Sequence, residues 1–274
     1  MNANRILLPV IPFSISILMN ASVFAESYDC LIEPYQIINI SSPVEGLLEH
    51  IRVDTSDIVK RGDVLVELES SVERATVDAA QARASATGEL RAKETEYVYN
   101  KRQAKRLGEL YKKQAVSSHE KDEADTNVQL ARLGIKQTKE SLQLAELELK
   151  RAEAELNQRI VHSPVNGVVM DRQHAEGEFV REEPILRIAQ LDPLRIEAIL
   201  PASEFGSVSV GESVKVQADS PVSRTLVAKI TRIDRVIDAA SGTFAVRLEL
   251  PNSDYKMPGG IKCKVDFTTS TASK

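Results

Sequence analysis

Side chains that could do chemistry are few in this sequence, and none of them forms a recognisable motif. The four histidines are scattered along the chain without the short paired spacings of zinc ligands: His50, His119, His162 and His174. Beyond the first 25 residues only Met170 and Met257 remain as methionines, too few for a relay that hands on a soft metal ion. The sequence therefore predicts neither a metal site nor a bound cofactor.

Carboxylates are the other side chains that could support catalysis. Two pairs have the close spacing that general acids and bases use: Asp63 with Glu67, and Asp171 with Glu176. Both pairs lie in turn-rich segments, where carboxylates usually face solvent. The sequence also lacks a G-x-S-x-G motif, a Cys–His pairing and a glycine-rich phosphate loop. We therefore expect no enzymatic activity.

The first 25 residues are typical of a secretory signal peptide. Arg5 supplies a positive start, residues 6–19 are mostly apolar, and Ala25 ends a small-residue cleavage site. The apolar run is shorter than the roughly 20 residues that a membrane span needs. We therefore expect export of a mature chain with 34 basic and 40 acidic residues, whose net charge of −6 argues against nucleic-acid binding.

Two cysteines, Cys30 and Cys263, lie near the two ends of this mature chain. Export would bring them into an oxidising compartment, where a disulfide could join them. Two buried thiols are the alternative, which the sequence alone does not exclude.

One short pattern occurs twice. SSPVEGLLEHIRV, from Ser41, aligns without a gap on HSPVNGVVMDRQH, from His162, at a distance of 121 residues. Six aligned positions are identical: Ser42 with Ser163, Pro43 with Pro164, Val44 with Val165, Gly46 with Gly167, Val59 with Val180 and Leu65 with Leu186. Each copy has short strands separated by turn residues, so two matching half-sheets are expected to pack as one small β-sandwich.

The segment between the copies, from Ser71 to about Gln158, contains no proline and is rich in good helix formers. Its second half has small and apolar residues at alternating spacings of four and three: Ala124, Val128, Ala131, Ile135, Thr138, Leu142, Ala145, Leu149, Ala152 and Leu156. This is the seam of a coiled coil. Small residues alternate with large ones along it, so a partner helix can approach closely.

The first half of this segment is less regular. Its inward face is predicted at these positions: Ala75, Ala79, Ala82, Ala86, Leu90, Tyr97, Ala104 and Tyr111. The pattern breaks in KKQAVSSHEKDEAD, where Ser117 or Ser118 can cap a new helix. Glu120 or Glu123 would favour the first turn of that helix. Two helices of about 40 residues must then run antiparallel, as a hairpin about 60 Å long.

The repeat resembles a carrier domain. S-P-V-x-G followed by DIVKRGDVLVELES is similar to half of a biotinyl or lipoyl domain, and splitting that domain with a long α-hairpin is the arrangement of periplasmic adaptors. These proteins, also called membrane fusion proteins, belong to tripartite efflux and secretion systems. LDPLRIEAILPASEFGSVSVGESVKV and MPGGIKCKVDF resemble the family's β-barrel domain. Lys60 is not at the carrier turn, so a carrier function is not expected.

The resemblance implies a mostly β protein with a long α-helical coiled-coil hairpin, a split lipoyl-like β-sandwich and a small β-barrel, in an elongated modular architecture. A hinge is expected around Leu191-Asp192-Pro193, and the family's membrane-proximal domain is expected to be missing. The expected divisions are a signal peptide (1–25), an N-terminal strand with the first lipoyl-like half (26–70), the hairpin (71–159), the second lipoyl-like half (160–191), the barrel (192–268) and a C-terminal tail (269–274).

The hairpin tip carries a narrower resemblance. In adaptors that dock on TolC-like outer-membrane channels, an arginine, a leucine four residues later and a serine seven further mark the tip, and Arg106, Leu110 and Ser117 keep these spacings. Arg106 and Leu110 would share one helix face. The resemblance implies channel docking by these residues. Taken singly, they would be explained by a solvated charge, packing within the hairpin and a plain helix cap.

The resemblance also implies the partners. These are an inner-membrane transporter, a TolC-like channel and further copies of the chain, typically six in a ring. A resistance-nodulation-division (RND) transporter is favoured, with a type I (ABC) or major-facilitator (MFS) system as the alternative. A structural coiled-coil protein of the envelope would explain the heptads but not the repeat. The mature chain would work in the periplasm, associated with the inner membrane through its pump.

Overall fold

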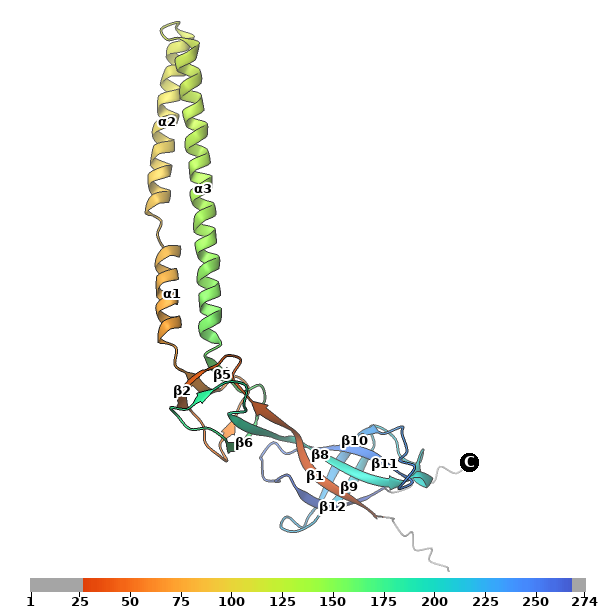
Figure 1. Cartoon of the computed structure of the whole chain (residues 1–274). Helices are drawn as coiled ribbons and strands as arrows, with labels where there is room; N and C mark the ends of the chain where they lie inside the picture. The colour runs from red at the N-terminus through yellow and green to blue at the C-terminus, as the bar shows by residue number, and fades with distance from the viewer. Residues whose placement is uncertain (1–26, 268–274) are drawn as a thin grey trace, which may run out of the picture. The chain divides into compact units, whose positions relative to one another are not determined.

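The computed structural model describes residues 27–267, and Figure 1 shows their secondary structure. The expected signal peptide and the expected C-terminal tail lie outside the described residues. The described chain divides into two compact units, one of residues 33–194 and 251–259 and the other of residues 27–32, 195–250 and 260–267. Within this range none of the helices has the length and apolarity that a membrane span requires.

The first unit contains a β-sandwich to which both copies of the repeat contribute strands. One sheet has the order β5-β4-β2-β7, and in the other β1 pairs β8, followed by β6 and β3. The strands are β1 (Ser27–Ile40), β2 (Gly46–Ile51), β3 (Ile58–Val59), β4 (Val64–Leu68), β5 (Ile160–His162), β6 (Gly167–Arg172), β7 (Phe179–Val180) and β8 (Leu186–Pro201). Each sheet therefore mixes strands from the two copies, in equivalent order.

The repeated residues have equivalent positions in this sandwich. Four of the identical apolar residues are buried in one core, and Val44 and Val165 are half-buried against it: Val59, Leu65, Val180 and Leu186 form the buried set. The two serines make the same local hydrogen bond, since Ser42 Oγ donates to the Val44 carbonyl at 2.5 Å and Ser163 Oγ donates to the Val165 carbonyl at 2.7 Å. Two similar halves sharing one core are the structural basis of the repeat.

Between the copies the chain forms the expected helical hairpin, with α1 (Ser71–Ala84), α2 (Gly88–Lys112) and α3 (Ser118–Asn157) (Figure 1). It leaves the sandwich after β4 and returns at β5, the strand that pairs with β4. One expectation is wrong: the first arm is two helices, interrupted at residues 85–87. Ser85, Thr87 and Gly88 have lower helix propensity than the neighbouring alanines. Residues 85–87 are also exposed, so packing against α3 does not offset this low propensity, and the helix is interrupted there.

The inward face of α3 follows the predicted seam. All ten seam positions are buried or half-buried, whereas the leucines between them are exposed: Leu130, Leu133, Leu144 and Leu147. The predicted inward face of the first arm is wrong at its start, because Ala75, Ala79, Ala82 and Ala86 are exposed. Val77 and Ala80 face inward instead. The prediction failed here because alanines occur on every side of this helix and are too small to indicate which side packs against α3.

The second unit is a β-barrel with the strand order β1-β12-β9-β10-β11-β8, in which β1 also pairs with β8. Its further elements are η1 (Ala202–Glu204), β9 (Ser213–Ala218), β10 (Thr225–Ile233), β11 (Thr243–Leu250) and β12 (Ile261–Asp266). Alternate residues of β9, β11 and β12 are buried, as in a strand with one face on a core. The N-terminal strand is part of this barrel, because residues 27–32 pair with β12.

The predicted hinge segment Leu191-Asp192-Pro193 lies within the long strand β8. The buried side chain of Asn252 binds this segment, since its Nδ2 donates to the Leu191 carbonyl at 3.1 Å. The backbone N–H of Asn252 also donates to Asp192 Oδ1 at 2.9 Å. The chain is therefore extended and hydrogen-bonded at this point.

Candidate docking site at the hairpin tip

The helix α2 ends at the tip in a Schellman motif. The Gln114 N–H donates to the Tyr111 carbonyl at 2.9 Å, and the Ala115 N–H donates to the Leu110 carbonyl at 3.0 Å. Gln114 has a φ of 56°, in the left-handed region where glycine is usual. The backbone of Leu110 therefore supports the turn, and its position relative to the turn is fixed.

The helix α3 begins directly after the turn with a capping box. Ser117 Oγ accepts a hydrogen bond from the Glu120 N–H at 3.3 Å, and Glu120 Oε2 accepts from the Ser117 N–H at 2.8 Å and from Ser117 Oγ at 2.9 Å. The backbone N–H and the hydroxyl of Ser117 lower the pKa of the Glu120 carboxyl. The reciprocal bonds satisfy free N–H groups at the start of the helix and hold the turn in one conformation.

Of the three predicted docking residues, Arg106 and Leu110 face outward on the last turns of α2. The Arg106 side chain is exposed and, within residues 27–267, has no hydrogen-bond or ion-pair partner. Leu110 is 41% exposed, one helical turn further on. Leu107 and Val116 are half-buried and pack inside the tip instead. Packing within the hairpin therefore leaves a large part of Leu110 exposed.

The structure gives the three marked residues different surroundings. Arg106 and Leu110 are free to contact a partner, whereas the Ser117 hydroxyl is engaged in the capping box. Sequence reasoning missed two features of the tip. Gln114 takes the left-handed position without the glycine that would have signalled it, and Tyr111, predicted to face inward, is 42% exposed. The tip thus presents a cation, an apolar side chain and an aromatic ring on a rigid turn.

This arrangement suits binding between helices rather than catalysis. An exposed leucine can enter an apolar groove, and a guanidinium beside it can donate several hydrogen bonds to carboxylate or carbonyl groups at the rim. Over the described part of the chain, no cluster of three or more His, Cys, Asp or Glu side chains could hold a metal ion. The four histidines lie apart from the tip, except His119 in the first turn of α3.

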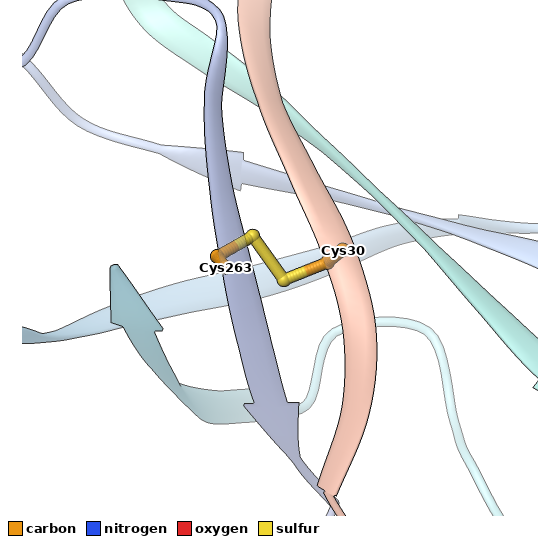
Figure 2. The surroundings of a disulfide bond; sticks show 2 residues. All are labelled: Cys30 and Cys263. Carbon is orange, nitrogen blue, oxygen red and sulfur yellow. A yellow bond between two sulfur atoms is a disulfide. The ribbon is translucent and has the colours of Figure 1, made fainter. Parts of the chain in front are cut away.

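The other predicted site residues lie away from the hairpin. Cys30 on β1 and Cys263 on β12 are joined by a disulfide in the structure, directly across the strand pair (Figure 2). Pro43 and Pro164 lie in bends, and Gly46 and Gly167 are the first residues of β2 and β6. Both glycines are needed for close packing, because an added Cβ would overlap neighbouring atoms.

Comparison with known families agrees with this architecture. Residues 36–190 match the family model of the CzcB-like, barrel-sandwich hybrid domain, which spans more than half of the chain. Residues 194–271 match that of the CusB-like, beta-barrel domain. The chain therefore belongs to the periplasmic adaptor, or membrane fusion protein, family, a non-catalytic kind of protein.

Individual relatives are moderately similar. The chain is 27% identical over 233 residues to the multidrug resistance protein MdtA of Photorhabdus laumondii, covering 81% of this chain and 55% of that protein. It is 22% identical over 269 residues to the pyoverdine export membrane fusion protein PvdR of Pseudomonas aeruginosa, covering 88% and 69%. The crystal structure of MacA from Actinobacillus actinomycetemcomitans shares the fold, with a TM-score of 0.73, 22% identity and coverage of 88% and 78%. The chain spans little more than half the length of most curated relatives that it matches.

Proposed function

We propose that this chain is the periplasmic adaptor subunit of a tripartite efflux pump, bridging an inner-membrane RND transporter and a TolC-like outer-membrane channel. The observation that carries the proposal is the rigid hairpin tip, where Arg106 and Leu110 face outward on a family architecture built for bridging. Similarity to proteins named for multidrug resistance and for pyoverdine export supports the efflux role. The RND-type barrel family matched by residues 194–271 supports the transporter class.

Each part of the chain has a role in the proposed mechanism. Leu110 enters an apolar groove between helices of the channel, and Arg106 bonds polar groups at its rim. Ser117 acts as a positioning residue, because its capping box fixes the turn that presents them. The barrel faces the transporter, and copies of the chain assemble as a ring around it. The adaptor seals and couples its two partners without chemistry of its own, so the choice of cargo belongs to the transporter.

The test is a photo-crosslink from the tip in intact cells. A photoreactive amino acid at position 110 should give an adduct that contains an outer-membrane channel. Arg106→Asp should abolish both this adduct and export, because it places a carboxylate where a cation is needed. Arg91→Asp is the matched control: it changes an exposed arginine of the same helix about 22 Å from Arg106, and should leave both intact.

Two results would reject the proposal. Wild-type export with Arg106→Asp would show that the tip does not dock through this residue. Adducts with other copies of the chain alone, at normal expression, would favour a structural coiled-coil role in the envelope.

A further inference from the structure

We propose that a groove between α2 and α3, beside Arg106 and Leu110, binds a lysine or arginine side chain of the outer-membrane channel. Seven residues line this groove: Asn100, Gln103, Leu107, Glu120, Glu123, Ala124 and Asn127. The inference rests on the proposed function, because it requires a channel at the tip. It deepens that function by adding a second contact and by naming the chemistry of the partner group.

The groove is continuous with the predicted docking residues. On α2, Gln103 and Leu107 line it. Arg106 lies three residues after Gln103, and Leu110 lies three residues after Leu107. Spacings of three and four residues place side chains on one face of a helix, so all four share a face. A partner helix that covers Arg106 and Leu110 therefore reaches the groove as it continues along the hairpin.

The walls of the groove carry amide side chains that are free to bind a partner. Asn100 is half-buried, and Gln103 and Asn127 are exposed. Within residues 27–267 none of these three side chains makes a hydrogen bond to the rest of the chain. Each amide has an oxygen that accepts and an NH₂ group that donates. Together they offer several acceptors to a group that carries several N–H donors.

The groove also has an excess of negative charge. Its lining includes two carboxylates, Glu120 and Glu123, and no basic residue. Lys121 lies between them in the sequence but binds Asp125, with 2.7 Å between Nζ and Oδ2. Glu123 has no ion pair among the described residues. An ionised carboxylate beside amide oxygens favours a cationic donor, because hydrogen bonds between charged groups are stronger than neutral ones.

The floor of the groove favours a long side chain. Ala124 is buried and Leu107 is half-buried, so both present apolar atoms below the polar walls. Lysine and arginine lay their methylene stems on apolar surface while the charged head reaches polar groups. The groove volume of 290 Å³ leaves room for such a side chain. A basic side chain therefore matches the floor and the walls together.

The two contacts require opposite groups on the channel. Arg106 needs a carboxylate or carbonyl group, whereas the groove needs a cation. Seven residues separate Gln103 from Leu110, so the basic side chain should lie about 10 Å from the position that receives Leu110. Two contacts of opposite charge fix the orientation of the tip on its partner, since a reversed orientation would bring like charges together.

Photo-crosslinking from the groove tests the position of the contact. In intact cells that express the complete system, a photoreactive amino acid at position 103 should give a channel adduct, mapped by mass spectrometry within one helical turn of a lysine or arginine. Position 105 is the control: Lys105 is exposed on the same helix but is rotated by about 200° and should give at least about fivefold less adduct. Equal adducts from both positions, or adducts only with other copies of this chain, would overturn the proposal.

Charge changes test the chemistry of the contact. Glu123→Lys should reduce the channel adduct from position 103 about tenfold or more, because it opposes one cation with another. Glu123→Gln keeps the size of the side chain, removes its charge and should reduce the adduct several-fold. Glu109→Lys is the matched control, since Glu109 is an exposed carboxylate of the same tip outside the groove, and should leave the adduct unchanged.

The variants keep the test decisive even where folding changes. If circular dichroism shows that Glu123→Lys melts early, Glu123→Gln alone carries the test, and a wild-type adduct from it would reject a cationic ligand. Equal losses for Glu123→Lys and Glu109→Lys, with unchanged melting, would reject the groove as the place of the contact.

The crosslink from position 110 separates this inference from the proposed function. A channel adduct from position 110, with none from position 103, would keep the bridging role and reject the groove. Absence of a channel adduct from both positions, at normal expression, would reject the bridging role as well.

Discussion

The guanidinium of Arg159, just beyond α3, binds Glu73 in the first turn of α1, with 2.6 Å between Nη2 and Oε1. The same side chain donates from Nη1 to the Glu45 carbonyl, at 3.0 Å, immediately before β2. Both charged side chains are mostly buried. One residue therefore ties the two ends of the hairpin to each other and to the first turn of the repeat.

Arg159→Met should destabilise the protein by about 1–3 kcal/mol, because Glu73 would lose its partner in a mostly buried site. Chemical denaturation followed by helical circular dichroism would measure the loss. Arg151→Met is the matched control, since Arg151 pairs with Glu155 at 2.8 Å on the exposed surface and should contribute less than about 0.5 kcal/mol. Equal losses for the two variants would contradict the anchoring role.

The repeat glycines should differ in their tolerance of alanine. At Gly46 an added Cβ would meet side-chain atoms of Arg159 and Leu68, which can move. At Gly167 it would meet the backbone oxygen of Ala189, which cannot move without disturbing β8. We expect Gly167→Ala to cost about 2–3 kcal/mol and Gly46→Ala about 1 kcal/mol, measured by urea unfolding. The reverse order would show that the β6–β8 contact is looser than described.

The seam of α3 can be tested with two neighbouring leucines. Leu142 is half-buried on the seam, whereas Leu144 on the same helix is 62% exposed. Leu142→Asp should lower the melting temperature of the hairpin strongly, because it places a charge against α1 or α2 at a cost of several kcal/mol. Leu144→Asp should change it little. Similar melting curves for both variants would place the seam elsewhere.

The capping box should make the tip sensitive to acid. The hydrogen bonds from Ser117 lower the pKa of the Glu120 carboxyl in the folded state. Its stabilisation is therefore present above the unfolded pKa, about 4.3, and is lost as the pH falls through the lower folded pKa. Melting of the wild type and of Glu120→Gln, which cannot ionise, should differ at pH 7, and the difference should shrink as the pH falls through the folded pKa of Glu120. A constant difference across this range would exclude the carboxylate as its source.

The disulfide should stabilise the barrel, because it links the first and last strands across 233 residues of sequence. Cys30→Ala with Cys263→Ala should lower the free energy of unfolding of the barrel by about 2–5 kcal/mol. Calorimetry with and without reductant would show this. Reductant should lower the melting temperature of the wild type towards that of the double variant and leave the variant unchanged. If complete reduction left the melting temperature of the wild type unchanged, this bond would have no structural role.

The sequence predicts those parts of the fold that depend on residues close together in the chain. The α3 seam could be predicted because spacings of four and three place residues on one face of a helix. This depends only on helix geometry and not on which helix packs against that face. Ser117 and Glu120 were among the predicted capping residues, since the capping box depends on four consecutive residues. The inward face of α1 was predicted wrongly, because an alanine-rich helix has no large side chain to mark one face.

By itself, the sequence determined that two related half-sheets flank a helical hairpin, because identities at a constant distance of 121 residues are visible without coordinates. It also placed Arg106 and Leu110 on one helix face. Only the tertiary structure decided that β1 joins the barrel and that Arg159 ties the hairpin to the sandwich. The tertiary structure alone also brought Leu47 beside Phe179 and Ile58 beside Val168. Such pairings join residues more than 100 positions apart, and they depend on how whole strands pack rather than on any local pattern.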